Sequence, residues 1–206
     1  RCLKMQVNLY SFVSALSAVI PFAPKNDVRY YLNGVHLVSC EGGFYVEATD
    51  GHTAVRVKID TTEPVADLDL VIPHDVCAKV SAFKVAKKYR KEKVISFEWH
   101  GLGGSFSDGQ SSVSFEAIEG KYVDLGRVMR APAADASRPS DRGVNALYLA
   151  RAGKSAAILA NPKYHGVAMV GAHGASDNLI FKVPTDHGDF LQISEPALFV
   201  ICPIKL

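Results

Sequence analysis

The chain has 206 residues, 48% of them hydrophobic, so it can bury a substantial core as one large domain or two small ones. Its 23 basic and 21 acidic residues give a formal net charge of +2. This balance excludes a protein that holds nucleic acid by an overall excess of positive charge, so any such contact must be a local patch.

The four cysteines are far apart and form no C-x-x-C pair, which argues against a zinc site and against a dense disulfide framework. No apolar run approaches the roughly 20 residues that span a bilayer. The N-terminus also lacks the series of regions that marks a signal peptide. We therefore expect a cytoplasmic protein without membrane contact.

The first part of the chain predicts a strand, a helix and three more strands. Residues 4–9 alternate between apolar and polar, as in a strand, and Ser11 is expected to cap the helix that follows. Turn signals separate three strand-like segments. The helix stripe is Phe12, Val13, Leu16, Val19 and Ile20, and the later strand segments are residues 30–38, 44–49 and 54–59.

The same order returns in a second unit. Residues 68–72 predict a strand, and a helix is expected to open near Pro73, with Val76, Val80 and Phe83 on one stripe. Three strand-like segments follow, at residues 94–99, 104–107 and 113–117. A boundary then lies between residues 130 and 143, where Ala, Pro, Ser, Asp and Arg replace patterned sequence.

A third unit begins after this boundary. Asn145 precedes a predicted helix that Pro162 ends. The strand-like segments after it are residues 166–170, 179–183, 190–193 and 197–201. We therefore predict an α+β fold of tandem βαβββ units. The expected divisions are a two-unit domain at residues 1–132, a linker at 133–143 and a condensed single-unit domain at 144–206.

Four stretches carry a resemblance to a known family. Residues 27–35 read DVRYYLNGV and residues 48–52 read ATDGH, which resembles the middle domain of the bacterial DNA polymerase III beta subunit, the ring-shaped DNA sliding clamp. Residues 118–122 (IEGKY), with Arg127 and Val128 after them, are similar to the segment closing that domain. The final CPIKL, residues 202–206, is similar to the family's C-terminal tail.

The resemblance implies the DNA-clamp fold, with helices on one face of antiparallel sheets. A full family member has three domains of two units each, and its ring holds twelve units. Three units are predicted in this shortened relative, with the middle domain intact and the last domain condensed into one unit. Four copies could therefore close a ring, while a two-chain assembly and a monomeric adaptor stay open.

In the family, client proteins insert a short peptide into an apolar pocket between the middle and last domains. Apolar concavities with a few polar groups suit such peptides. Thr53 and Ala54 depart from the family, which usually has Arg and a larger aliphatic residue there. The matching positions are Leu32, Thr49, Gly51, His52, Thr53, Ala54, Pro73, Val200, Cys202, Pro203, Ile204 and Leu206.

A simpler interpretation applies to part of this set. Residues 48–53 also suit a hairpin turn, in which Asp50 and Gly51 serve turn geometry alone. The tail at residues 199–206 is too apolar to stay in water, so it must pack as core or as a pocket wall.

Clamps line their hole with basic helices that face phosphates, an attraction without sequence preference. The densest basic cluster of this chain lies at residues 84–93, where a solvated helix end is the alternative. The resemblance gives these DNA-facing candidates: Lys79, Lys84, Lys87, Lys88, Arg90, Lys91, Arg151 and Lys154.

No catalytic motif or cofactor site is predicted. Residues 50–52 (DGH) and 186–189 (DHGD) each place a carboxylate near an imidazole, but such loop pairs usually form turns. Phe97 and Trp99 on an alternating strand indicate sheet packing, with base stacking as the alternative.

Three functions follow as hypotheses. The first is a homo-oligomeric, clamp-like processivity factor that holds a DNA polymerase or other clients on double-stranded DNA by short peptides. The second is an adaptor or decoy that binds client peptides without encircling DNA. The third is a small metal- or His-dependent hydrolase using His52 or His187.

Overall fold

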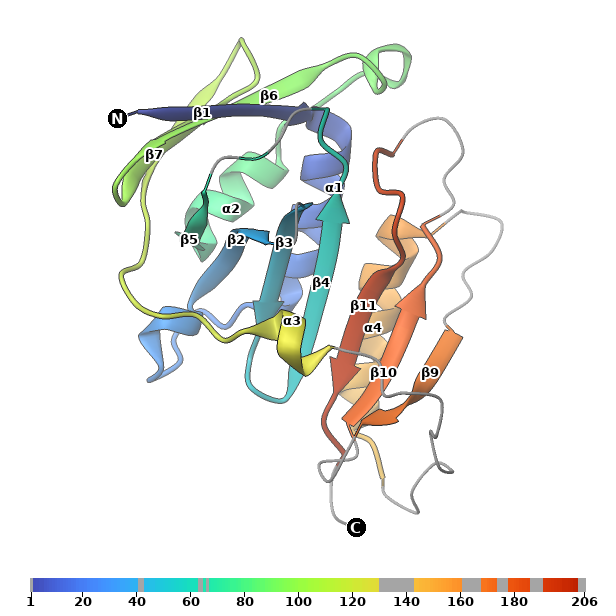
Figure 1. The fold of residues 1–206 in the computed structure, drawn as a ribbon. Coiled ribbons are helices and arrows are strands. Elements are labelled where there is room, and N and C mark those ends of the chain that lie inside the picture. Colours follow the sequence, from blue (N-terminus) through green and yellow to red (C-terminus); the bar gives the residue numbers. More distant parts are fainter. Residues whose placement is uncertain are drawn as a thin grey trace.

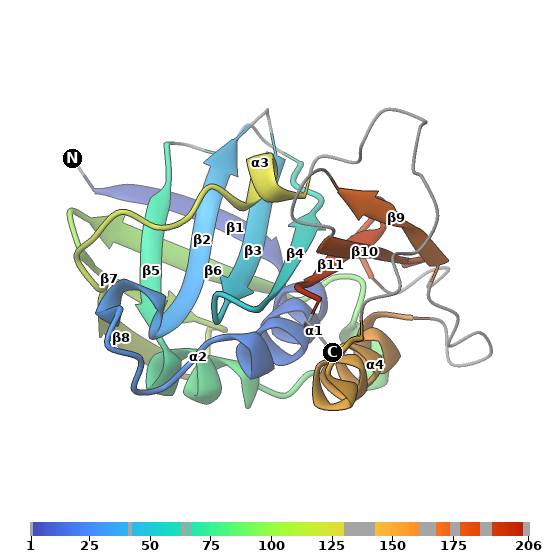
Figure 2. The same cartoon turned by 90° about the horizontal axis from the view of Figure 1, so that it is seen from below.

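Two antiparallel sheets and a set of helices make up the described part of the chain (Figures 1 and 2). The computed structural model describes residues 2–40, 43–62, 65, 67–129, 143–160, 168–173, 178–185 and 191–203. Within these residues the sheets have the strand orders β1-β6-β7-β8 and β5-β2-β3-β4-β11-β10-β9. The α+β class predicted from the sequence is confirmed.

The first two units exchange their leading strands. The first unit runs β1 (Leu3–Asn8), α1 (Leu9–Val19), β2 (Gly34–Cys40), β3 (Gly43–Thr49) and β4 (Thr53–Ile59). The second runs β5 (Asp69–Pro73), α2 (His74–Ser81), β6 (Val94–His100), β7 (Gly103–Ser107) and β8 (Ser112–Glu116). Strand β1 pairs with β6 and β5 pairs with β2, so each unit completes the other's sheet.

The third unit extends the sheet of the first. It contains α4 (Ala146–Leu159), β9 (Ala168–His173), β10 (Asn178–Val183) and β11 (Ala197–Ile201). Strand β11 lies antiparallel to β4, with Phe199 opposite Val55. Figure 1 shows β9, β10 and β11 continuing the sheet beyond β4. Hydrogen bonds between β4 and β11 therefore join the first and third units.

Helix α1 is the centre of the core. It packs against β3 and β4 of the larger sheet, β1 and β6 of the smaller one, and helices α2 and α4. Phe12 stacks with Phe44 of β3 at 6.1 Å and with Phe106 of β7 at 5.7 Å between ring centroids. Burying such an aromatic side chain stabilises the fold by roughly 1.5–3 kcal/mol. Through Phe12, helix α1 packs against both sheets.

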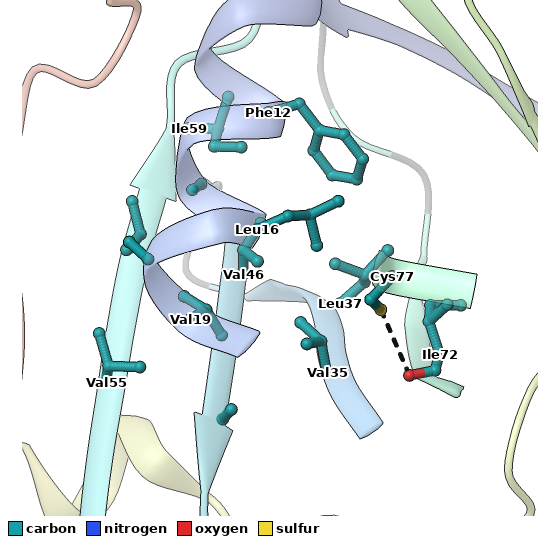
Figure 3. Close-up of a cluster of buried hydrophobic side chains, with 14 of the residues drawn as sticks. Phe12, Leu16, Val19, Val35, Leu37, Val46, Val55, Ile59, Ile72 and Cys77 are labelled. Carbon is teal, nitrogen blue, oxygen red and sulfur yellow. Dashed lines mark hydrogen bonds between the residues drawn. The ribbon is translucent and has the colours of Figure 1, made fainter. Parts of the chain in front are cut away.

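The stripe predicted on this helix faces the sheet. Figure 3 shows Phe12, Leu16 and Val19 directed toward the side chains of β2, β3 and β4. Cys77 of α2 lies at the edge of this cluster, and its thiol donates to the carbonyl oxygen of Ile72 over 3.5 Å. Burial raises the pKa of that thiol to about 12, so Cys77 acts as an apolar core residue.

Several element boundaries differ from the sequence-based expectations. Asn8, not Ser11, caps α1: its Oδ1 accepts from the backbone N of Ser11 and from the Ser11 hydroxyl, both at 2.9 Å. Ser11 is fully buried inside the helix it was expected to start. Residues Tyr30–Leu32 form a 3-10 turn, η2, and the strand begins only at Gly34.

The second helix is shorter than predicted. It ends at Ser81, so Phe83 follows it, and the basic residues 84–93 lie in a connection that contains the 3-10 turn η3 (Lys87–Tyr89). In the third unit, residues 191–193 are irregular where a strand was predicted, and Phe190 lies outside the described residues. A short helix, α3 (Leu125–Val128), was not predicted.

Candidate functional site

A cavity of about 200 Å³ lies where the first unit, α3 and the third unit meet. The first unit contributes η2 and the β3–β4 turn, and the third unit contributes Asn178 of β10 and the end of β11. Figure 1 shows α3 lying across β3 and β4, next to the third unit. Its lining residues are Arg29, Tyr31, Leu32, Thr49, Gly51, His52, Thr53, Ala54, Val123, Leu125, Val128, Asn178, Val200 and Cys202.

The turn between β3 and β4 is fixed by Asp50. Its Oδ1 accepts from the backbone N of His52 at 2.9 Å, and from the backbone N and hydroxyl of Thr53 at 2.7 and 3.0 Å. Gly51 adopts a φ of 85°, a conformation that favours glycine. The Asp50-Gly51 pair therefore has the turn-forming role that its residue types indicate.

Two arginines from other parts of the chain donate hydrogen bonds to this turn. Arg29, paired with Asp27 at 2.7 Å, donates from Nη2 to the Asp50 carbonyl oxygen at 2.9 Å. From α4, Arg151 donates through Nη1 to Asp50 Oδ2 and, at 3.0 Å, to the Thr53 hydroxyl. The chain just after β11 also contacts the turn, because the backbone N of Cys202 donates to the His52 carbonyl oxygen at 2.8 Å.

These contacts set the ionisation of the two carboxyl groups. Burial disfavours the charged form of Asp50, but hydrogen bonds from Arg151, Thr53 and His52 outweigh it and lower the Asp50 pKa below its ordinary value. Hydrogen bonds from the Arg29 side chain and backbone lower the pKa of Asp27 to about 2. Both carboxylates are charged at neutral pH and hold their arginines in place.

Residues 118–129 form the outer wall of the cavity. Tyr122 is buried in this segment, and its hydroxyl accepts from the backbone N of Thr49 at 3.0 Å. Its ring lies 4.4 Å from that of His36, between centroids. Asp124 caps α3 by accepting from the backbone N of Arg127 at 3.0 Å. This anchoring places Leu125 and Val128 in the cavity wall.

A row of polar side chains crosses the sheet under this wall. The two ring nitrogens of His36 lie 2.8 Å from Glu47 Oε1 and Asp69 Oδ1. Arg56 Nε lies 3.1 Å from Glu47 Oε2, and the Arg56 guanidinium stacks 3.7 Å from the Tyr45 ring centroid. Strands β2, β3 and β4 place His36 opposite Glu47 and Glu47 opposite Arg56, so the Glu47 carboxylate contacts both neighbouring side chains.

The structure brings together most of the positions expected for a peptide pocket. Leu32, Thr49, Gly51, His52, Thr53, Ala54, Val200 and Cys202 line the cavity. Pro73, at the end of β5, and Pro203 do not line it. Ile204 and Leu206 lie outside the described residues.

The cavity also includes residues that sequence reasoning missed. Arg29 and Tyr31 belong to the DVRYYLNGV stretch that was singled out, so their proximity to Leu32 could have suggested them. Val128 belongs to the stretch that is similar to the segment closing the family's middle domain. Val123 and Leu125 carry no local signal for a wall, because only the path of residues 118–129 across the sheet brings them there. Asn178 arrives through the pairing of β10 with β11.

The expected DNA-facing residues do not share one helix face. Lys79 of α2 is exposed and lies 3.4 Å from Asp75, and Lys154 is exposed on α4. Arg151 differs from expectation, because its guanidinium is directed into the Asp50 turn. Arg90 is half-buried over the Tyr10 ring at 4.1 Å. The exposed members of the connection after α2 are Lys84, Lys87, Lys88 and Lys91.

The residues considered for catalysis and for base stacking have other roles in the described part of the chain or lie outside it. They contain no group of three or more His, Cys, Asp or Glu side chains that could hold a metal ion. The Asp50 carboxylate next to His52 is committed to the turn, while residues 186–189 lie outside the described part. Phe97 and Trp99 are buried and stacked on each other at 4.6 Å, which is sheet packing and leaves no ring face for a base.

No helix in the described part of the chain is long and apolar enough to cross a membrane.

The fold is that of the DNA sliding clamps. The clamp of Pseudomonas aeruginosa superposes with a TM-score of 0.62 at 17% identity, over 99% of this chain and 67% of that one. The Caulobacter crescentus clamp gives 0.72 at 14% identity, over 98% and 65%. The Bacillus subtilis clamp gives 0.71 at 12% identity, over 99% and 64%.

Sequence comparison points to the same proteins. The beta sliding clamp of Pseudomonas aeruginosa is 27% identical over 153 residues, which is 73% of this chain. The chain spans 39% of the length of that curated relative. No family model matches the chain. The resemblance to the bacterial DNA polymerase III beta subunit, the sliding clamp, is therefore confirmed in both sequence and fold.

Proposed function

We propose that this chain is a clamp-like scaffold that tethers a DNA polymerase or another client to DNA by binding a short peptide of that client. The observation that carries the proposal is the junction cavity, whose apolar walls come from Leu32, Ala54, Leu125, Val128 and Val200. An apolar concavity with Arg29 and His52 at its rim suits a peptide with an aliphatic or aromatic anchor.

The proposed mechanism is tethering and involves no bond-making step. Holding a polymerase beside its template raises the effective concentration of the two partners, so processivity increases without chemistry in the scaffold. The chain is therefore proposed to be non-enzymatic and to need no cofactor, with a separate machine for loading. A cytoplasmic location and sequence-independent contact with double-stranded DNA belong to the same proposal.

The assembly proposed is a homo-oligomer, with a ring of four chains as the specific hypothesis. Among the described strands, those at the ends of the two sheets are β1, β8, β5 and β9, and an edge strand of this kind can pair with another chain. The mass in solution, measured by light scattering across a concentration series, tests this assembly. A monomer at every concentration would favour the adaptor hypothesis.

Peptide binding is tested with a matched pair of variants. Val123 lines the cavity and is 39% exposed, while Val94 on β6 is 43% exposed and lies elsewhere. A labelled clamp-binding peptide should bind the intact protein, and Val123→Glu should weaken binding at least tenfold because a carboxylate enters an apolar wall. Val94→Glu should bind normally.

The two variants give clear alternatives. Equal binding by Val123→Glu and the intact protein would exclude the junction cavity as the site. Absence of binding to the intact protein would remove the client-docking role and leave the clamp fold without this function.

A further inference from the structure

The basic residues after α2 lie on an ordered surface, here called the basic platform and defined as residues 84–93. Within it, the backbone N of Lys93 donates to the carbonyl oxygen of Tyr89 at 2.9 Å. The platform is tied to the start of α1, because the backbone N of Leu9 donates to the Lys93 carbonyl oxygen at 2.8 Å. The Asn8 side chain also donates to the carbonyl oxygens of Arg90 and Lys91 at 2.8 and 3.2 Å.

The charge of the protein is concentrated on this platform. Residues 84–93 hold six basic residues and one acidic residue, a formal charge of +5, whereas the whole chain has +2, so the rest of the chain has −3. Within the platform, Lys93 forms an ion pair with Asp108 at 3.3 Å. A local excess of this size on an ordered backbone attracts phosphate groups, which the remainder of the molecule repels.

The helix faces do not offer an equivalent surface. Helix α1 has no charged residue. On α2, Lys79 is offset by Asp75, and on α4 Arg151 is directed into the Asp50 turn, which leaves Lys154. Phosphate contact through basic helix faces would therefore rest on very few charges in this chain.

An exposed aromatic ring lies among the lysines of the platform. Tyr89 is 48% exposed, and the Lys88 Nζ lies 4.6 Å from its ring centroid. Rings flanked by cations bind unpaired bases by stacking while the cations neutralise the backbone. Bases inside a duplex are already stacked on one another, so an exposed ring of this kind distinguishes single strands from duplexes.

We propose that the basic platform is a binding site for single-stranded DNA, with Lys87 and Lys88 contacting phosphates and Tyr89 stacking on a base. The proposal deepens the DNA contact of the proposed function and rests on it. It places that contact at the N-terminal end of α1 and not on the helix faces. The strand bound there is the unpaired template or primer end beside a tethered polymerase.

The test is a fluorescence anisotropy titration of the full chain with a labelled oligo(dT) of about 16 nucleotides, a length that covers the larger known site sizes. Two double variants remove the same charge. Lys87→Gln with Lys88→Gln changes the platform, and Lys79→Gln with Lys154→Gln changes the helix faces. The platform variant should bind about tenfold more weakly at near-physiological salt, with a shallower salt dependence. The helix variant should bind like the intact protein.

The stacking contact is tested separately. Tyr89→Ser should weaken oligo(dT) binding about tenfold, because the base loses the aromatic ring on which it stacks. Tyr89→Phe should retain binding, and a duplex of the same length should bind both variants equally. Duplex binding that equals oligo(dT) binding, or a Tyr89→Ser variant that binds normally, would overturn the single-strand assignment.

The result can be separated from that of the peptide experiment. Platform variants should bind the client peptide with unchanged affinity, since none of their residues lines the junction cavity. Loss of DNA binding only in the helix variant would overturn the platform while leaving peptide docking intact. Loss of peptide binding in Val123→Glu alone would not contradict DNA binding by the basic platform.

Discussion

Asp50 connects two parts of the molecule that are about a hundred positions apart in sequence. Its carboxylate holds the backbone of its own turn at His52 and Thr53, and it also receives the guanidinium of Arg151 from α4. The side chain is only 19% exposed, so little water competes for these bonds. Asp50 therefore forms the local turn and also holds the third unit against the rim of the cavity.

Replacing Asp50 by alanine should lower the free energy of unfolding at neutral pH by about 1–3 kcal/mol, because the Arg151 guanidinium and the turn amides lose their acceptor. Urea denaturation measures this change. Asp75→Ala is the matched control: its pair with Lys79 is 71% exposed on the aspartate side, and such surface pairs contribute at most about 1 kcal/mol. Equal effects of both substitutions would contradict the role given to Asp50.

The contribution of Asp50 should also depend on pH. Because its pKa is lowered in the folded state, its stabilisation is fully present above the unfolded value of about 3.9 and is lost as the pH falls through the lower, folded value. The stability difference between the intact protein and Asp50→Asn should therefore be constant from neutral pH to about pH 5 and shrink below about pH 4. A difference that persists unchanged in acid would show that the carboxylate charge is not involved.

At the scale of elements, the space around each glycine decides whether a larger side chain fits there. Gly34, at the start of β2, lies so near β5 that a Cβ there would be 2.3 Å from the Ile72 carbonyl oxygen. Gly126 in α3 lies against the Arg56 guanidinium, with a Cβ placed there only 2.6 Å from Nη1. By contrast, a Cβ on Gly153 of α4 would meet nothing within 4 Å.

Two glycine substitutions should therefore change stability in opposite directions. Gly153→Ala should raise the free energy of unfolding by roughly 0.5–1 kcal/mol, because alanine loses less backbone entropy in a helix. Gly34→Ala should lower it by about 1–3 kcal/mol, because the β2–β5 pair must move apart. Thermal unfolding of both variants measures the change. A stabilising Gly34→Ala would refute the close approach of the two strands.

At the scale of the whole molecule, the third unit shares its core with the first. Strand β11 continues the sheet of β4, and Phe199 packs against Phe22 at 5.6 Å between ring centroids. Helix α4 also packs against α1, the central helix of the core. These contacts predict that the described units unfold together, although the resemblance assigns them to separate domains.

Trp99, the single tryptophan, reports on this cooperativity from the smaller sheet. Phe199→Ala removes a fully buried ring and should lower stability by about 3–5 kcal/mol. The transition seen by Trp99 fluorescence should move together with the one seen by circular dichroism. Leu147→Ala, at a side chain that is 74% exposed, should shift neither. A Trp99 transition that stays in place while circular dichroism shifts would show that the third unit unfolds on its own.

The sequence by itself determined the repeating order of elements and the family resemblance. Apolar periodicity on α1 and the alternation along the strands depend on local spacing, which is visible without coordinates. The DVRYYLNGV and ATDGH stretches also identified the residues around Leu32 and His52 that line the cavity. The first residue of α1 was harder to predict, because Asn8 and Ser11 are both suitable helix caps. The structure shows that Asn8 is the cap, accepting from the backbone N of Ser11.

Only the tertiary structure decided how the units combine. The exchange of β1 and β5 between units, the pairing of β4 with β11 and the path of residues 118–129 all depend on contacts between distant segments. The same holds for Arg151, whose sequence context on a helix indicated an exposed basic face. Its acceptor, Asp50, is supplied by another unit, so the ion pair forms only when folding brings the two units together.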